Sequence, residues 1–310
     1  MKIGFIGSGS ISKFHIAALN NNGFDIVALG TKENSLRCEK FAKDNLLLDV
    51  YCKGGWREVI EREPDAFCLC IDTNFTTEIL LEILNKDKPI LVEKPISYKI
   101  SDINSICNHK NRNRVFVGYN RRFYNNINQA KIFCDNSEGG TVYISIPDSK
   151  QGTERFLSNA CHIIDIARYL FGDFKILNKV IKNNSSNEME YVIALCSNQK
   201  WTISFNAHSL IPANFEITIN SGKRVFCLKP IEKYNLYEGL EVIEPDNNYP
   251  LRRYMPKIIS SGFENADLKP GFDYMYKQFM EFIYSNKPTK NSVSIFEAKA
   301  TLQKCLEFLK

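Results

Sequence analysis

The sequence predicts an α/β protein in which a doubly wound parallel sheet is followed by a mostly antiparallel one. Residues 1–119 alternate short apolar runs with segments of helical periodicity, and a glycine turn follows the first run. From residue 120 onward, long stretches alternate apolar and polar residues with a period of two. A length of 310 residues suits two such domains. We therefore expect domains over residues 1–119 and 120–310.

The apolar runs of the first part are three to six residues long, as is typical of parallel strands buried on both faces. Strands are predicted at Lys2–Ile6, Phe24–Leu29, Ala66–Ile71, Ile90–Val92 and Val115–Tyr119, with a weaker one at Leu46–Val50. Helices are predicted near residues 11–19, 35–42, 56–60, 78–86 and 101–108.

The second part combines helical and period-two patterns. Helices are predicted at residues 127–133, 161–170, 274–284 and 294–309, and strands at 142–146, 215–219 and 225–228. The clearest alternation places Trp201, Ile203, Phe205 and Ala207 on one face and Thr202, Ser204, Asn206 and His208 on the other. This pattern predicts a sheet with one apolar and one polar face.

Composition narrows the function classes. The net charge of +5 is spread along the chain, and the basic cluster around Arg112 lacks the aromatic interleaving of a nucleic-acid surface. No apolar run is long enough to span a bilayer, and no signal peptide is recognisable. Ten cysteines form no C-x-x-C motif, and several lie in apolar runs. We expect a cytoplasmic protein with reduced thiols and no metal site, which binds neither nucleic acid nor membrane.

A candidate dinucleotide-binding turn lies between the first strand and the first helix, as in a Rossmann domain. Gly7 permits a tight turn, Gly9 admits a pyrophosphate, and the helix start supplies a positive dipole end. Ser12 stands where the fingerprint has glycine or alanine, so a strand-turn-helix without ligand is the alternative. The residues expected to touch the cofactor here are Gly7, Ser8, Gly9, Ser10 and Ile11.

The end of the second strand bears on the choice of cofactor. An NAD-selective site places an acidic residue there for the ribose hydroxyls. This chain has Thr31 and Lys32, with Arg37 a few residues later, and these groups would attract a 2′-phosphate. The cofactor is predicted to be NAD(P), with NADP favoured over NAD, although Glu33 could rotate into the site.

Two further strand ends reach the edge of the sheet where ligands bind. Cys70, Asp72 and Asn74 follow one strand; Asp72 is expected to line the nicotinamide pocket, and a neighbour to cap the next helix. Glu93 and Lys94 follow another strand and precede Pro95, which stiffens the backbone. Lys94 could move a proton there, and a solvated strand end is the alternative.

One histidine is singled out. His162 and Asp165 are three residues apart on one helix face, so the carboxylate could orient a cleft-facing imidazole. A partly buried structural histidine is the alternative. His15 and His208 are interpreted as structural.

The motifs Gly7-Ser-Gly9, Glu93-Lys94-Pro95, the run from Val117 to Phe123 and the helix from His162 to Gly172 resemble the Gfo/Idh/MocA family of nicotinamide-dependent sugar oxidoreductases. The resemblance implies a Rossmann domain followed by an α+β domain with a large open sheet. It also implies a sugar, cyclitol or nucleotide-sugar substrate. It assigns Lys94 and His162 to catalysis and places Tyr119, Asn120 and Arg122 near the substrate.

Two departures from the family pattern concern the substrate pocket. Ser158 stands where members with an acid/base pair carry Asp, and the segment ending at Thr76 lacks the usual proline and histidine. The residues expected to contact substrate are Lys94, Tyr119, Asn120, Arg122, Ser158, His162 and Asp165.

The predicted function is hydride transfer between nicotinamide and a carbinol or keto carbon of a sugar or nucleotide-linked sugar. Two alternatives remain: a non-catalytic sensor on the same fold, and non-redox sugar chemistry through transient oxidation. The resemblance further implies a homodimer or homotetramer formed through the open sheet.

Overall fold

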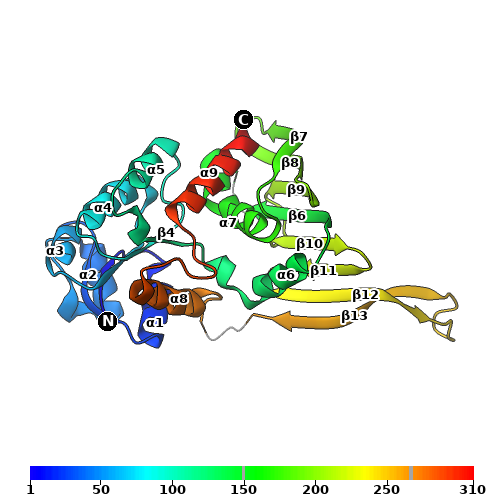
Figure 1. Cartoon of the computed structure of the whole chain (residues 1–310), viewed down its shortest axis with the longest axis horizontal. Coiled ribbons are helices and arrows are strands. Elements are labelled where there is room, and N and C mark those ends of the chain that lie inside the picture. Colours follow the sequence, from blue (N-terminus) through cyan, green and yellow to red (C-terminus); the bar gives the residue numbers. More distant parts are fainter. Residues whose placement is uncertain (149–150, 265–267) are drawn as a thin grey trace. The chain divides into compact units, whose positions relative to one another are not determined.

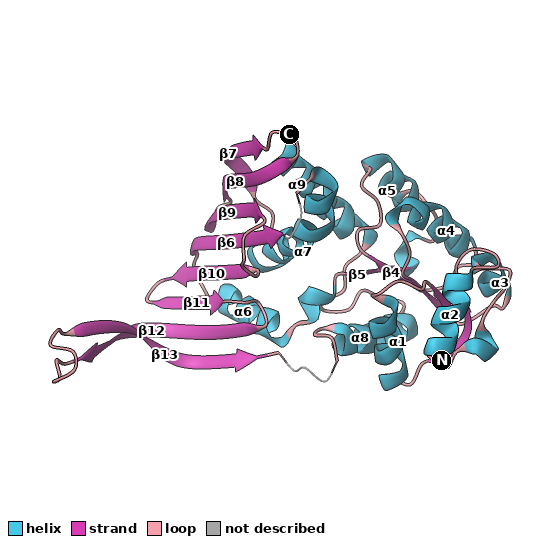
Figure 2. Ribbon diagram, turned by 180° about the vertical axis from the view of Figure 1, so that it is seen from behind, coloured by secondary structure: helices cyan, strands magenta, loops and turns pink. Residues whose placement is uncertain are grey.

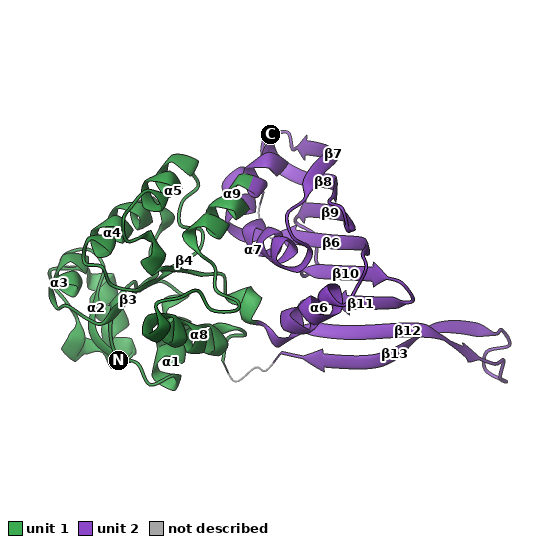
Figure 3. Cartoon of the chain, in the orientation of Figure 1, with its two compact units in different colours: residues 1–123, 266–303 green, residues 124–265, 304–310 purple. Residues whose placement is uncertain are grey.

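A computed structural model of the chain describes residues 1–148, 151–264 and 268–310. The chain forms two compact units (Figure 3). The first contains residues 1–123 and 266–303, and the second contains residues 124–265 and 304–310. No helix within the described ranges is both long and apolar enough to cross a membrane.

The first unit is built on a parallel sheet of five strands in the order β2-β1-β3-β4-β5. These strands are β1 (Lys2–Ile6), β2 (Asp25–Gly30), β3 (Ala66–Leu69), β4 (Ile90–Glu93) and β5 (Val115–Gly118). The helices are α1 (Ser12–Asn21), α2 (Leu36–Asp44), α3 (Trp56–Glu61), α4 (Thr73–Asn85), α5 (Ile100–Cys107), α8 (Phe272–Ser285) and most of α9 (Ile295–Leu309). Short 3₁₀ helices are η1 (Leu48–Val50), η2 (Arg112–Arg114) and η3 (Asn120–Phe123). The predicted Rossmann-type parallel sheet is thus confirmed.

The core of this unit follows from the apolar runs in its strands. Ile3, Phe5 and Phe116 are fully buried, as the prediction of strands covered on both faces requires. Aromatic residues of α8 complete the core, and the Phe279 ring meets the Phe116 ring edge-on at 5.5 Å.

The predicted strand over Leu46–Val50 is wrong. Only η1 and one isolated parallel bridge between Leu29 and Tyr51 occur there. Leu46 has a φ of 59° and lies almost fully exposed, and the Leu47 amide returns to the carbonyl of Ala42. These residues end α2 through a left-handed turn. The apolar run therefore forms a helix terminus and not a strand.

The second unit is built on an eight-stranded sheet in the order β13-β12-β11-β10-β6-β9-β8-β7. Its strands are β6 (Gly140–Asp148), β7 (Lys175–Asn183), β8 (Met189–Ser197), β9 (Trp201–Ser209), β10 (Glu216–Ser221), β11 (Arg224–Leu228), β12 (Lys233–Ile243) and β13 (Arg253–Phe263). Only β6 and β9 pair in parallel, and the other neighbours are antiparallel. The ribbon of β12 and β13 runs beyond the ends of the neighbouring strands (Figure 1).

Helices α6 (Asn125–Asp135) and α7 (Thr153–Phe171) cover one face of this sheet (Figure 2). The predicted alternation in β9 is confirmed: Ile203 and Phe205 are buried beneath the helices, whereas Ser204 and Asn206 are not. The opposite face is less polar than expected. Tyr143, Ile193 and Leu195 are 38–45% exposed there, between the polar residues of β9.

The structure divides the chain differently from the predicted domains at its C-terminal end. Residues 266–303, expected in the second domain, belong to the first unit. The reason lies in α8, whose Tyr276 and Phe279 are fully buried in the core of that unit. Asp273 on α8 also accepts hydrogen bonds from Asn21 and Asn22 at the end of α1.

A salt bridge joins η3 to α9 inside the first unit. The buried Arg122 guanidinium donates to the Glu297 carboxylate at 2.9 Å, and the Ser294 amide and hydroxyl donate to the same carboxylate at 3.0 Å. Burial opposes ionisation of Glu297, but Arg122 and Ser294 hold the pKa of its carboxyl below the ordinary value.

We predict that Glu297→Gln lowers the free energy of unfolding by about 1–3 kcal/mol at pH 7. Breaking a fully buried pair costs about 3–5 kcal/mol, and solvent screening reduces that figure for this partly exposed carboxylate. Because the folded-state pKa lies below the unfolded value of about 4.3, the stabilisation is present above that pH and disappears as the pH falls further. Denaturant titrations at pH 7 and pH 3 measure the difference.

The matched control is Glu82→Gln, at an exposed position on α4. It should change stability by no more than about 0.5 kcal/mol. An equal loss in both variants, or a Glu297 effect that persists undiminished at pH 3, would contradict the assignment.

Candidate functional site

The glycine turn after β1 has the geometry that a dinucleotide requires. The Gly7 amide donates to the Gly30 carbonyl at 3.2 Å, which ties the turn to the end of β2. A Cβ atom on Gly7, whose φ is 156°, would lie 2.4 Å from the Cys70 carbonyl oxygen. A Cβ atom on Gly9 would meet nothing within 4 Å. The structure therefore needs glycine at position 7, whereas the space at Gly9 is open to a ligand.

Ser12 fits the third position of the fingerprint. Its side chain is fully buried, and its hydroxyl accepts a hydrogen bond from the Gly9 amide at 3.1 Å. Among the described residues no side chain caps the N-terminus of α1, and its first turn has no acidic residue. The positive end of α1 is thus available to the pyrophosphate of a dinucleotide.

The residues predicted at the end of β2 lie at the same edge. Thr31 is partly buried, and Lys32 and Arg37 are exposed. Burial raises the pKa of the Cys38 thiol, which lies between this strand end and the glycine turn, whereas the Thr31 and Ser8 side chains both act to lower it.

Asp72 has a different role from the pocket-lining one that was expected. Its carboxylate accepts from the Asn74 amide at 2.9 Å, so Asp72 itself is the N-cap of α4. The sequence favoured a neighbour as the cap and Asp72 as pocket lining. The N-cap position explains the difference, because a carboxylate there satisfies a backbone amide that the helix leaves unpaired. Asn74 is exposed in the first helical turn, and Cys70 is buried at the end of β3.

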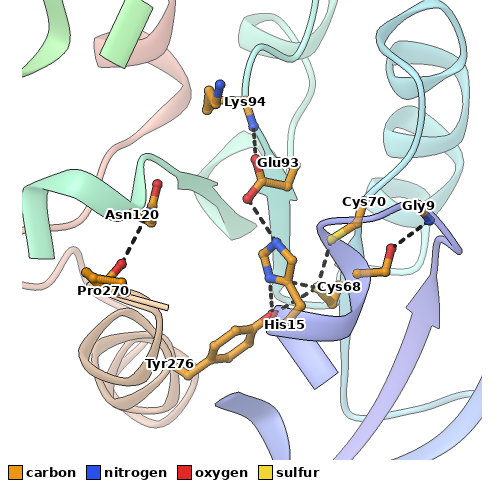
Figure 4. Close-up of polar contacts among 10 residues, drawn as sticks. Gly9, His15, Cys68, Cys70, Glu93, Lys94, Asn120, Pro270 and Tyr276 are labelled. Carbon is orange, nitrogen blue, oxygen red and sulfur yellow. Dashed lines mark hydrogen bonds and ion pairs between the residues drawn. The ribbon is translucent and has the colours of Figure 1, made fainter. Parts of the chain in front are cut away.

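Glu93 ends β4 and is held from two directions (Figure 4). Its Oε2 accepts from the Lys94 amide at 3.1 Å, and its Oε1 lies 2.9 Å from Nε2 of His15 on α1. The Lys94–Pro95 peptide bond is cis, and Lys94 is partly buried. The carboxylate thus links the helix after the glycine turn to the strand end that carries Lys94.

His15 is structural, as predicted, but it connects more of the site than the sequence suggested. It is fully buried, and its Nδ1 lies 2.7 Å from the Tyr276 hydroxyl on α8. Burial alone would lower the pKa of His15, but Cys68 and Glu93 raise it to about 9. Burial likewise opposes ionisation of Cys68, yet Cys70, His15 and Tyr276 lower its pKa to about 6.

Lys269 is a candidate that the sequence analysis missed. Its ammonium lies 4.8 Å from the ring centre of Phe14 on α1. Burial lowers its pKa, as do the nearby charges of Arg121 and Lys94, whereas Glu93 opposes this shift. Lys269 stands in an irregular segment before α8, and no motif spacing marks it.

The segment after β5 is anchored within the first unit. Tyr119, Asn120 and Arg122 are all buried. The Asn120 amide donates to the Pro270 carbonyl at 3.1 Å, and Arg122 pairs with Glu297. The side chains of Asn120 and Arg122 therefore have a structural role, and their contact with substrate stays a prediction.

The predicted residues of the second unit all lie on α7. His162 is 7% exposed and Asp165 is fully buried. Asp165 lies near Cys305. Burial raises the pKa of the Cys305 thiol, and the nearby Cys161 and Asp165 raise it further. Ser158, one turn before His162, donates its hydroxyl to the Arg155 carbonyl at 3.0 Å.

Comparison with known proteins finds a family match for the first part of the chain. Residues 1–120 match the family described as an oxidoreductase family with an NAD-binding Rossmann fold, GFO_IDH_MocA. Over these residues the chain is similar to that family. The glycine turn and the Glu93-Lys94 strand end of this family both fall inside the matched region.

A curated relative is the myo-inositol 2-dehydrogenase of Thermotoga maritima, 25% identical over 188 residues. That match covers 56% of this chain and 55% of the relative, so the chain aligns with about half the length of this protein.

Two solved structures share the fold of the whole chain. A dehydrogenase (MviM) from Clostridium difficile has a TM-score of 0.82 at 18% identity, covering 100% of this chain and 98% of the other. The UDP-N-acetylglucosamine 3-dehydrogenase of Acidithiobacillus ferrooxidans has a TM-score of 0.77 at 13% identity, covering 99% and 96%. At these identities the likeness concerns the fold, and it includes the mostly antiparallel second sheet.

The two glycines of the turn should respond differently to alanine. Gly7→Ala drives a Cβ into the Cys70 carbonyl, so we expect a loss of about 1–3 kcal/mol in stability together with weaker dinucleotide binding. Gly9→Ala meets no atom, so stability should hold or rise by a few tenths of a kcal/mol, roughly, while dinucleotide affinity falls. Thermal unfolding and fluorescence titration with NADH and NADPH measure the two effects separately.

If Gly9→Ala bound both dinucleotides as tightly as the native chain, the turn would not be the pyrophosphate site. If Gly7→Ala kept full stability, the close approach to Cys70 would be of no consequence.

Proposed function

We propose that the protein is an NAD(P)-dependent oxidoreductase that transfers a hydride between nicotinamide and a carbinol or keto carbon of a sugar or nucleotide-linked sugar. The observation that carries the proposal is the position of Lys94. It follows β4 at the ligand edge of an NAD-binding domain of the Gfo/Idh/MocA family, next to a carboxylate fixed by the helix after the glycine turn. The relatives named for myo-inositol and UDP-N-acetylglucosamine support a polyhydroxylated substrate.

The nicotinamide cofactor, when bound, accepts or delivers the hydride. Lys94 and His162 would handle the hydroxyl proton, each as a hydrogen-bond donor to the developing alkoxide. Lys94 is the proposed acid/base. The Glu93 oxygens accept from the Lys94 backbone amide and from His15, which fixes the strand end that presents the lysine.

The cofactor is proposed to be NADP. Lys32 and Arg37 are exposed at the end of β2, and Thr31 stands where an acidic residue would select NAD. A 2′-phosphate would gain charge-assisted hydrogen bonds from either cation.

A second candidate function is a sensor that binds nucleotide and sugar without turnover. Ser158 favours it, because its hydroxyl cannot replace an acid/base carboxylate and is turned to the Arg155 carbonyl. A third candidate is non-redox sugar chemistry through transient oxidation, in which the cofactor stays bound and no net reduced nucleotide appears. Following cofactor fluorescence and sugar composition together, with a panel of cyclitols and nucleotide sugars, separates the three.

The open face of the second sheet is the proposed contact between copies in a homodimer or homotetramer. Tyr143, Ile193 and Leu195 give this face apolar area, and Ser204 and Asn206 between them would make the interface partly wet.

Replacing the proposed acid/base should remove turnover while leaving the cofactor site intact. We expect Lys94→Met to reduce kcat by about 10²–10⁴-fold and to leave the dinucleotide Kd within about threefold. Steady-state kinetics on the substrate found in the panel, together with fluorescence titration, give both values. Lys86→Met, at the exposed C-cap of α4, is the control and should keep full activity. Turnover of Lys94→Met within a few-fold of native would remove the role.

The cofactor preference has its own test. Lys32→Ala should weaken NADPH binding by about tenfold, the equivalent of ~1.4 kcal/mol for one charge-assisted contact, and change NADH binding little. Lys40→Ala, an exposed lysine on α2 paired with Asp44, should alter neither. Equal effects of Lys32→Ala on NADH and NADPH would argue against recognition of a 2′-phosphate at this position.

A further inference from the structure

A compact set of metal-ligand side chains lies in the core of the first unit, behind the glycine turn. His15 comes from α1, and Cys68 and Cys70 come from β3 and its end. All three are buried, and their ligand atoms lie within 4.8 Å of one another (Figure 4). The two cysteines alternate with Leu69, so both sulfurs point to the same side of the strand.

The distances between these atoms suit a tetrahedral ion. Zn–S bonds of about 2.3 Å and Zn–N bonds of about 2.0–2.1 Å imply sulfurs about 3.8 Å apart and sulfur-to-nitrogen distances of about 3.6 Å. The Cys68 and Cys70 sulfurs are 3.5 Å apart, and the Cys68 sulfur lies 3.9 Å from Nδ1 of His15. These two pairs need shifts of a few tenths of an ångström, and the Cys70 sulfur, which lies within 4.8 Å of the other ligand atoms, would move by up to about 1 Å toward the imidazole.

A fourth donor and an outer partner complete the arrangement. The Tyr276 hydroxyl lies 3.0 Å from the Cys68 sulfur and 2.7 Å from Nδ1 of His15. On its other side, His15 is hydrogen-bonded through Nε2 to the Glu93 carboxylate at 2.9 Å. A ligating histidine almost always donates its second nitrogen in this way, which fixes the ring and raises its basicity.

The charges also agree with a buried ion. Two thiolates and a neutral imidazole around a divalent cation make a neutral group, which a core tolerates far better than an isolated charge. Binding releases the protons that the sulfurs and the binding imidazole nitrogen still carry. Soft sulfur donors with one imidazole favour zinc or a similar thiophilic ion over magnesium or calcium.

We propose that His15, Cys68 and Cys70, with the Tyr276 hydroxyl as fourth donor, bind one Zn²⁺-class ion as a closed structural site. The ion would join α1, β3 and α8 and would hold the glycine turn from behind. A Cβ atom on Gly7 would lie 3.0 Å from the Cβ of Cys70, so the cysteine and the turn are in direct contact. The proposal does not depend on the reaction that the protein performs.

The test uses the full chain freed of metal and titrated with Co²⁺, whose absorption reports tetrahedral sulfur ligation. We expect one equivalent to bind with thiolate charge-transfer and tetrahedral ligand-field bands, and Zn²⁺ to displace it. Cys70→Ser should weaken Co²⁺ binding by at least about tenfold, and Glu93→Gln by about 10–100-fold. Cys227→Ser is the control, since Cys227 lies on β11 of the second unit and should leave the titration unchanged.

A second measurement covers the case in which Cys70→Ser does not fold. X-ray absorption of the Zn²⁺-loaded native chain should show two sulfurs at about 2.3 Å and nitrogen or oxygen at about 2.0–2.1 Å. The proposal is overturned if the native chain binds no stoichiometric ion. It is also overturned if folded Cys70→Ser titrates like the native chain, or if the zinc shell holds four sulfurs or oxygen alone.

Discussion

The hydrogen bond between His15 and Glu93 is the constraint around which the first unit is arranged. It joins the helix that follows the glycine turn to the strand that ends in Lys94, at 2.9 Å and in the interior. Through Tyr276 the same imidazole also reaches α8, which comes almost at the other end of the chain. Both oxygens of Glu93 are thereby engaged inside its own unit, one by His15 and the other by the Lys94 amide. A carboxylate held in this way keeps a fixed position while the neighbouring lysine remains at the ligand edge.

The elements that the sequence predicted are those governed by short-range periodicity. Continuous apolar runs located β1 to β5, and the alternation in β9 identified its buried face. The failure at Leu46–Val50 has the same origin, because an apolar run says nothing about whether its side chains find a partner. Leu46 takes a left-handed conformation that ends α2 and leaves its side chain in solvent. In this segment the contacts that end α2 outweigh a weak intrinsic preference for strand.

The candidate site was predictable only where the functional residues lie together in one short segment of the sequence. The glycine turn and the Glu93-Lys94 strand end are such segments. The contacts of Lys269 with Phe14 and of Tyr276 with His15 join residues more than 250 positions apart, and no spacing rule connects them. Asp72 shows a further limit, since an acidic residue after a strand suits both a pocket and a helix cap. The position of the Asn74 amide settles its capping contact.

The position of the buried His15–Cys68–Cys70 cluster bears on how the nucleotide site is prepared. Gly7 touches Cys70, and Ser12 holds the Gly9 amide, so the turn is supported by residues beneath it before any ligand arrives. A preformed turn loses little conformational freedom on binding, and that loss otherwise subtracts from affinity. The same reasoning explains why thiols suit positions 68 and 70. They are small enough to lie under a glycine turn, and the Cys68 sulfur still reaches the imidazole that orients Glu93, with the Cys70 sulfur 3.5 Å from that of Cys68. Support of the turn and alignment of the strand end that carries Lys94 therefore depend on one set of contacts.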